Sequence, residues 1–215
     1  MSLIALTTDS TSKYRSVVTS STDFKKDGTA VLIQYGDLTK LASHSKECND
    51  GYDLRVGGIF RDHRNNNAEV LSQDSHITLL PGNAVIIQTE EQVEFPVNRF
   101  GQIFPKVSLL QTGVANTPSK VDPGFRGHLL ITVFNYGKRK ARLYRGQPFC
   151  SLHVFSIEGP VRPYDKDPPE IGATGPASKL QKISDLAGAI PRSIEWLAIV
   201  VTALVAVMDH FLHVP

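Results

Sequence analysis

A tight turn at residues 121–127, Val-Asp-Pro-Gly-Phe-Arg-Gly, holds the side chains of this chain that are best suited to chemistry. Asp122 stands at the mouth of the turn, directly before the strand-like run His-Leu-Leu-Ile-Thr-Val-Phe-Asn. A carboxylate on a rigid turn can orient a water molecule or a hydroxyl group. Asp-Pro-Gly is also an ordinary turn sequence, because these residues suit tight backbone conformations. A turn alone does not explain the acid or the aromatic-Arg-Gly that follows it.

The elements that must hold this turn are short and strand-like. From Gly51 onward, apolar runs rich in β-branched and aromatic residues alternate with Gly, Pro and Asn. This cadence predicts an all-β sandwich or barrel. Residues 1–45 are polar and rich in Ser and Thr, with one strand-like run at 29–38. A chain of 215 residues, 41% of them hydrophobic and 20% charged, is long enough for one compact domain and an appendage.

The net charge and the spacing of the cysteines and histidines argue against several classes of function. A net charge of +2 provides no strong field for nucleic acid. Cys48 and Cys150 are the only cysteines, and the seven histidines show no metal-ligand spacing, so we expect no zinc site and no bound metal ligated by the protein. The N-terminal stretch has no signal-peptide pattern, which favours a cytoplasmic protein.

The C-terminal part differs in composition from the strand-rich part. Residues 162–176 are rich in Pro and Gly and predict a loop or tail, and residues 177–190 predict a short amphipathic helix. The apolar run 196–208 is shorter than the roughly 17–25 residues of a spanning helix. Basic residues precede it and Trp196 lies at its edge, so it is either a membrane anchor or a helix in an oligomer interface. We therefore predict an extension (1–45), a β core (46–161), a lid-like tail (162–180), a linker with a short helix (181–192) and a hydrophobic C-terminal helix (193–215).

Several motifs in the right order resemble those of the dCTP deaminase/dUTPase superfamily, and of its deaminase branch in particular. They are Tyr-Asp-Leu-Arg-Val-Gly at 52–57, the Pro-Gly, Thr-x-Glu and Pro pattern within 79–96, the turn at 121–127, Tyr-Arg-Gly-Gln-Pro-Phe at 144–149, and the Tyr and Gly-x-x-Gly-Pro of 163–180. The resemblance covers about residues 51–180.

The resemblance implies a fold, a ligand and a set of site residues. It implies a β-barrel-like, dUTPase-like homotrimer that binds a deoxynucleoside triphosphate, such as dCTP or dUTP, between subunits, with Mg²⁺ on the phosphates and without zinc. Asp122 would orient water or the 3′-hydroxyl, and the glycines of the turn would let the backbone approach the ligand. The other residues carried over are Lys106 and Ser108 on the phosphates, Gln111 in the same motif, Phe125 under the turn or against the sugar, Arg126 at the ligand or at a subunit interface, and Tyr164, Ser178 and Lys179 closing over the phosphates.

The sequence departs from the deaminase pattern at the residues that do the chemistry. The deaminases have a Glu where this chain has Thr132, and a hydroxyl group does not exchange its proton near neutral pH as a tuned carboxylate does. In the phosphate motif, Val107 offers no hydrogen bond, and Gln111 replaces a charged guanidinium fork with a neutral amide. Two hypotheses follow: a dCTP deaminase-like hydrolase of pyrimidine deoxynucleotide metabolism, or a catalytically degenerate, membrane-tethered nucleotide sensor.

Overall fold

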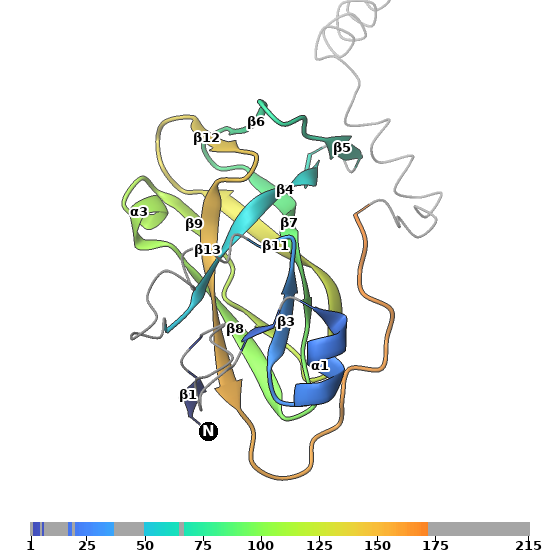
Figure 1. Cartoon of the computed structure of the whole chain (residues 1–215). Coiled ribbons are helices and arrows are strands. Elements are labelled where there is room, and N and C mark those ends of the chain that lie inside the picture. Colours follow the sequence, from blue (N-terminus) through green and yellow to red (C-terminus); the bar gives the residue numbers. More distant parts are fainter. Residues whose placement is uncertain are drawn as a thin grey trace, which may run out of the picture. The chain divides into compact units, whose positions relative to one another are not determined.

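The computed structural model describes residues 2–4, 6, 17–18, 20–36, 50–64 and 67–171 (Figure 1). The chain divides into two compact units, Met1–Ala173 and Thr174–Pro215. The predicted C-terminal helix, Ser178 and Lys179 lie outside the described residues. Among the helices that the structure does describe, none is long and apolar enough to cross a membrane. The membrane anchor and the domain boundaries therefore stay predictions.

The described part of the chain is mostly β, as its cadence predicts. The N-terminal elements are β1 (Leu3–Ile4), β2 (Val17–Val18), α1 (Ser21–Asp27) and β3 (Val31–Gln34). The central elements are β4 (Tyr52–Asp62), β5 (Ala68–Val70), β6 (His76–Leu79), β7 (Ala84–Glu94), β8 (Arg99–Pro105) and α3 (Val107–Leu110). The remaining strands are β9 (Val114–Asn116), β10 (Ser119–Val121), β11 (Arg126–Asn135), β12 (Ala141–Tyr144) and β13 (Pro148–Ser156).

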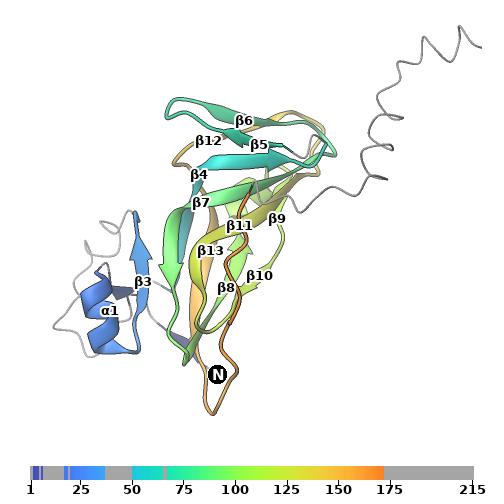
Figure 2. The ribbon, with the colours of Figure 1, turned by 90° about the vertical axis from the view of Figure 1, so that its right-hand side faces the viewer.

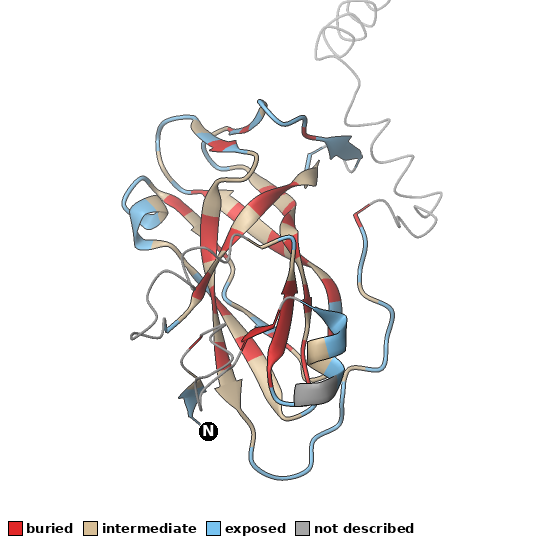
Figure 3. Ribbon diagram, in the orientation of Figure 1, coloured by how far each residue is buried: buried red, intermediate tan, exposed pale blue. Residues whose placement is uncertain are grey.

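One curled sheet carries most of these strands, in the order β10-β8-β13-β4-β7-β11-β9, and β12 pairs with β6 in a second, two-stranded sheet (Figures 1 and 2). Buried and half-buried residues alternate along β7 and β11, so one face of each strand lies on the core. Figure 3 shows the buried residues following the strands, whereas α3 and β5 are exposed. The strands coincide with the strand-length apolar runs from which they were predicted.

The N-terminal segment is tied to the core by strand pairing. β1 pairs with β13, and β3 pairs with the end of β7, where Leu32 lies opposite Glu94. The helix α1 was not predicted, because its Ser-Thr-Asp-Phe-Lys-Lys-Asp sequence contains a single apolar residue. It is held by its ends: the Ser20 hydroxyl accepts a hydrogen bond from the Thr22 amide (3.2 Å), and Gly28 closes it in the left-handed conformation.

Candidate functional site

The Asp122 turn joins β10 to β11 and leaves its carboxylate partly open to solvent. The Phe125 amide donates to the Asp122 carbonyl oxygen (3.1 Å), which closes the turn. The Lys120 ammonium lies 2.7 Å from Asp122 Oδ1, and the Asp122 side chain keeps 37% of its surface exposed. Lys120 was missed by sequence reasoning. Its signal was the short separation in sequence, since Asp122 follows Lys120 by two residues, just beyond the end of β10.

The two residues after the turn have different surroundings. Phe125 is buried, and its ring meets the ring of Tyr164 edge-on at a centroid distance of 5.3 Å. It therefore packs under the turn, which is one of the two roles that the sequence leaves open. Arg126 is well exposed, and its Nε lies 3.5 Å from Oε2 of Glu94 on the neighbouring strand.

The segment 159–171, which we call the strap, runs over the turn and the start of β11 (Figure 2, orange). The Tyr164 amide donates to the Pro123 carbonyl oxygen (2.7 Å), and the Tyr164 hydroxyl donates to the Asp167 carbonyl oxygen (3.1 Å). Ile171, at the end of the strap, is buried. The Tyr164 side chain of this chain is therefore engaged with the strap and with the turn beneath it.

The two glycines of the turn make room for the strap. A Cβ on Gly124 would lie 3.1 Å from the Pro163 Cβ, and a Cβ on Gly127 would lie 2.8 Å from the Pro168 Cβ. Both glycines also have positive φ angles, 78° and 148°. We expected these glycines to admit a ligand; instead, the space beside them holds the chain's own prolines.

Lys106 lies where β8 gives way to the one-turn helix α3, and it is paired within the chain. Its ammonium forms a short ion pair with Oδ2 of Asp53 on β4. The Ser151 hydroxyl, on β13, donates to the other carboxylate oxygen of Asp53 (2.8 Å). Lys106 retains 26% side-chain exposure. Asp53 and Ser151 were not singled out from the sequence, because three strands must be placed in register before these groups meet.

The rest of the predicted phosphate motif forms α3, which projects from the sheet. Val107, Ser108, Leu110 and Gln111 are exposed on this short helix. Val107 keeps 67% of its surface accessible. Ser108 and Gln111 are thus available at the surface.

Thr132 lies in the middle of β11, on the face directed away from the core. Its neighbours Ile131 and Val133 are buried, whereas Thr132 is half-buried. It pairs with Ile86 of β7, and its carbonyl oxygen accepts a hydrogen bond from the Thr117 amide (3.0 Å). The strand therefore presents a hydroxyl group at the position where the deaminase pattern has a carboxylate.

Within one chain, Asp122 lies far from both Lys106 and Thr132. Val121 pairs with Gly101, so Asp122 lies beside Phe100 at one end of β8, and Lys106 follows the other end. From Phe100 to Lys106 an extended chain advances about 20 Å, at roughly 3.3 Å per residue. Thr132 is separated from the turn by a similar length of β11. One subunit alone does not bring the predicted catalytic and phosphate-binding residues together.

A buried charge network holds β4 against β7. Glu91 is fully buried and accepts hydrogen bonds from the Tyr52 hydroxyl (3.0 Å), the Arg55 amide (2.9 Å) and Arg55 Nε (2.7 Å). Burial opposes the charge of Arg55, but its hydrogen bond and attraction to Glu91 prevail, so the pKa of Arg55 is raised. Thr89 adds a hydrogen bond from its hydroxyl to the Glu91 carbonyl oxygen (2.8 Å) and accepts one from the Leu129 amide (3.0 Å). The Thr-x-Glu motif is therefore a structural element of this core.

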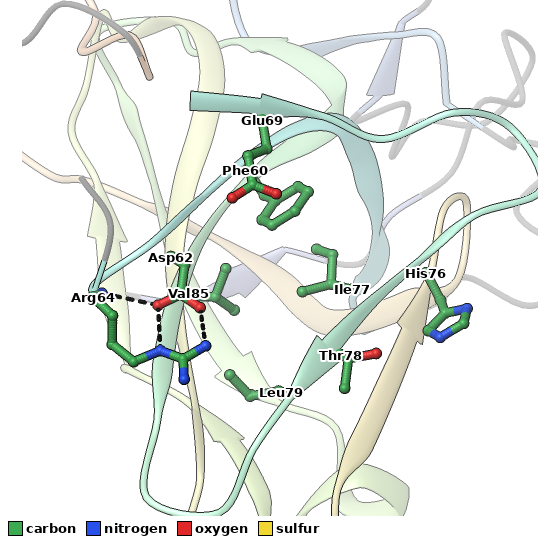
Figure 4. Close-up of a pocket in the computed structure, with 9 residues that line it drawn as sticks. All are labelled: Phe60, Asp62, Arg64, Glu69, His76, Ile77, Thr78, Leu79 and Val85. Atoms are coloured by element: carbon green, nitrogen blue, oxygen red, sulfur yellow. Dashed lines mark hydrogen bonds and ion pairs between the residues drawn. The ribbon is translucent and has the colours of Figure 1, made fainter. Parts of the chain in front are cut away.

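A cavity of about 530 Å³ opens between the end of β4, β5 and β6 (Figure 4). Its apolar lining comes from Phe60, Ile77, Leu79 and Val85. At its edge, Asp62 is held by Arg64 Nε (3.1 Å) and Nη2 (2.7 Å), and this hydrogen bonding lowers the pKa of Asp62. None of the lining residues belongs to the predicted site, so the cavity is separate from the Asp122 turn.

No metal site is formed by the residues that the structure describes. They contain no cluster of three or more His, Cys, Asp or Glu side chains that could hold an ion. A Mg²⁺ ion at the predicted nucleotide site would therefore be held by other ligands, and phosphate oxygens are ligands that Mg²⁺ favours.

The fold and the sequence motifs place the chain in a known class of nucleotide-processing proteins. The chain belongs to the dCTP deaminase-like family, whose model matches residues 31–157. A dCTP deaminase of Thermococcus kodakarensis is 30% identical over 115 residues, 53% of this chain and 73% of that protein. A dUMP-forming dCTP deaminase of Methanoregula boonei is 36% identical over 90 residues, 41% of this chain and 49% of that protein. The predicted membership of the superfamily is confirmed.

Relatives with a second activity match as well. A deoxyuridine 5′-triphosphate nucleotidohydrolase of Caldanaerobacter subterraneus is 36% identical over 90 residues, 40% of this chain and 59% of that protein. Among solved structures, a dCTP deaminase from Agrobacterium tumefaciens has a TM-score of 0.45 at 16% identity, covering 51% of this chain and 40% of that chain. A dUTPase from phage phi11 of S. aureus, described with a structural Mg(II) ion, has a TM-score of 0.45 at 12% identity, covering 66% of this chain and 99% of that chain. The chain thus spans from about half to three quarters of these curated relatives.

Proposed function

We propose that this protein binds a pyrimidine deoxynucleoside triphosphate, dCTP or dUTP, at sites formed between the subunits of a homotrimer. The separation of Asp122 from Lys106 and Thr132 supports this proposal most directly, because a shared site then needs groups from more than one chain. Lys106, Ser108 and Gln111 would meet the phosphates of a nucleotide whose sugar lies at the Asp122 turn of a neighbouring subunit.

The chemistry that fits these residues is hydrolysis at the triphosphate rather than deamination. The partly exposed Asp122 carboxylate can orient a water molecule, and Mg²⁺ bound to the phosphates would neutralise part of their charge. Deamination needs a group that moves protons at the cytosine amino group, and Thr132 provides only a hydroxyl. General acid–base catalysis contributes roughly 10²–10⁴-fold, so this replacement alone would reduce deamination by a factor in that range.

A second function is that of a nucleotide sensor without catalysis. It is favoured because the charged side chains of the site are already paired within the chain. Asp122 is ion-paired with Lys120, and Lys106 with Asp53. Together with Thr132 in place of a carboxylate, these ion pairs support a protein that has the family fold but lacks part of the catalytic chemistry. In this proposal the C-terminal apolar segment tethers the sensor to a membrane on its cytoplasmic side.

Purified protein assayed with a panel of nucleoside triphosphates, for both binding and turnover, separates the two functions. We expect binding of dCTP or dUTP and little or no deamination of dCTP. If hydrolysis occurs, Asp122→Asn should abolish it while leaving binding largely intact. Rapid deamination of dCTP by the unmodified protein would overturn our interpretation of Thr132, and Thr132→Glu tests the same position in the opposite direction.

The trimer and the tether have tests of their own. Analytical ultracentrifugation of the full chain should give the mass of three subunits, and a stable monomer that still binds nucleotide would exclude an intersubunit site. Membrane fractionation of tagged protein should show that deletion of residues 193–215 releases it into the soluble fraction. Equal distribution of both forms would exclude the tether.

A further inference from the structure

We infer that Asp53 is a positioning residue that holds the Lys106 ammonium as an internal counterion, and that a phosphate group entering this site must compete with Asp53 for that ammonium. The inference rests on the proposed function, because it concerns the cation that would contact the phosphates. It concerns a side chain on another strand, β4, which belongs to the Tyr-Asp-Leu-Arg-Val-Gly motif.

The geometry fixes Asp53 from two sides. Oδ2 of the carboxylate pairs with the Lys106 ammonium, and Oδ1 accepts a hydrogen bond from the Ser151 hydroxyl at 2.8 Å. Ser151 lies directly opposite Asp53 on the neighbouring strand, and Phe104 lies opposite Ser151 on the next. The carboxylate is thus held in line with the strand end from which Lys106 projects.

The strand order explains why the pair persists in the free protein. β8, β13 and β4 are adjacent, and Ser151 lies opposite Asp53, so these two side chains project from one face of the sheet. Lys106, which directly follows β8, reaches the same carboxylate. Both partners are partly shielded, with side-chain exposures of 26% for Lys106 and 38% for Asp53. Lys120, by comparison, is 72% exposed beside Asp122. The Lys106 pair is therefore the better protected of these two lysine–aspartate pairs.

The first test examines the free protein and needs no nucleotide. Brief acetylation with acetic anhydride, read by peptide mass spectrometry, should modify Lys106 more slowly than Lys120. An exposed or half-exposed ion pair contributes about 0.2–1 kcal/mol, so Asp53→Asn should raise labelling of Lys106 by a factor of about 1.4 to 5. Labelling of Lys120 serves as the internal reference for unfolding. Asp165→Asn, which breaks the exposed pair with Arg162, is the matched control and should leave Lys106 unchanged.

Ser151→Ala provides a second variant in case Asp53→Asn does not fold. Loss of the hydroxyl removes one of the two bonds that fix the carboxylate, so Lys106 labelling should rise by a smaller factor. Unchanged labelling of Lys106 in the folded variants would overturn the inference, whatever the protein binds.

The second test uses inorganic triphosphate and dUTP as probes in binding titrations at two salt concentrations. Asp53→Asn should bind both probes about two- to fivefold more tightly than the unmodified protein, and the gain should vanish in the Lys106→Ala background. A gain that persists without Lys106, or weaker binding by Asp53→Asn, would contradict the competition between Asp53 and phosphate. Failure of every variant to bind dUTP or dCTP would refute the proposed function instead, and the labelling experiment would still decide the role of Asp53.

Discussion

The Glu91→Ala substitution gives the sharpest test of how this fold is held together. Glu91 is fully buried and accepts three hydrogen bonds, two from Arg55 and one from Tyr52. Its removal breaks the hydrogen bonds that the Tyr52 hydroxyl and the Arg55 amide donate to this carboxylate. The Arg55 guanidinium also loses its counter-charge, although its side chain is 23% exposed and can partly reach water.

Breaking a buried ion pair from one side costs about 3–5 kcal/mol, and the partial exposure of Arg55 places this case near the lower end, at about 3 kcal/mol. For a domain of this size each kcal/mol lowers the midpoint of thermal unfolding by about 2–4 °C. We therefore expect Glu91→Ala to lower that midpoint by about 6–12 °C. Glu91→Gln keeps the shape and one acceptor oxygen, so its effect should be smaller, about 1–3 kcal/mol.

Urea and thermal unfolding monitored by circular dichroism measure these differences. Glu90→Ala is the matched control, since Glu90 is the adjacent residue on the same strand, is partly exposed, and lies 3.6 Å from Arg145. It should cost less than about 1 kcal/mol. A Glu91→Ala variant no less stable than the Glu90→Ala variant would refute the view that the network holds β4 against β7.

Two further predictions concern the strap and the core. Gly127→Ala should loosen the strap and lower the free energy of unfolding by about 1–3 kcal/mol, because φ is 148° there and a Cβ would collide with Pro168. Trypsin should then cleave within residues 159–171 faster than in the Gly146→Ala control, whose Cβ would meet nothing within 4 Å. Burial raises the pKa of the Cys150 thiol well above its ordinary value, so in a Cys48→Ser background a thiol reagent should react slowly with native protein and rapidly in urea. Fast reaction of that native protein would show that the core around Cys150 opens readily.

The strands could be predicted because their information is local. The runs that form β7 and β11 are rich in apolar and β-branched residues and are bounded by Gly, Pro or Asn, and these signals can be read directly from the sequence. The pair of Lys120 and Asp122 was also accessible, since the two residues are only two positions apart in the sequence. The contact between Lys106 and Asp53 was not, because it depends on the order and register of β8, β13 and β4.

The role of the turn glycines shows the same limit. Sequence reasoning expected a Cβ on the turn glycines to collide with a bound ligand, whereas in the folded chain it would meet other residues of the same chain. The partners, Pro163 and Pro168, lie on the strap, and only the folded chain places it over the turn. A position that demands glycine therefore indicates a close approach, without telling a ligand from the chain itself.

Family membership and activity rest on different residues in this chain. Tyr52, Thr89 and Glu91, which carry much of the family resemblance, are buried and hold strands together, so their presence supports the fold. Thr132 and Gln111, where the sequence departs from the deaminase pattern, lie outside the buried core: Thr132 is half-buried and Gln111 is exposed. The resemblance therefore supports the family and a dUTPase-like core, whereas the activity depends on positions such as Thr132 and Gln111.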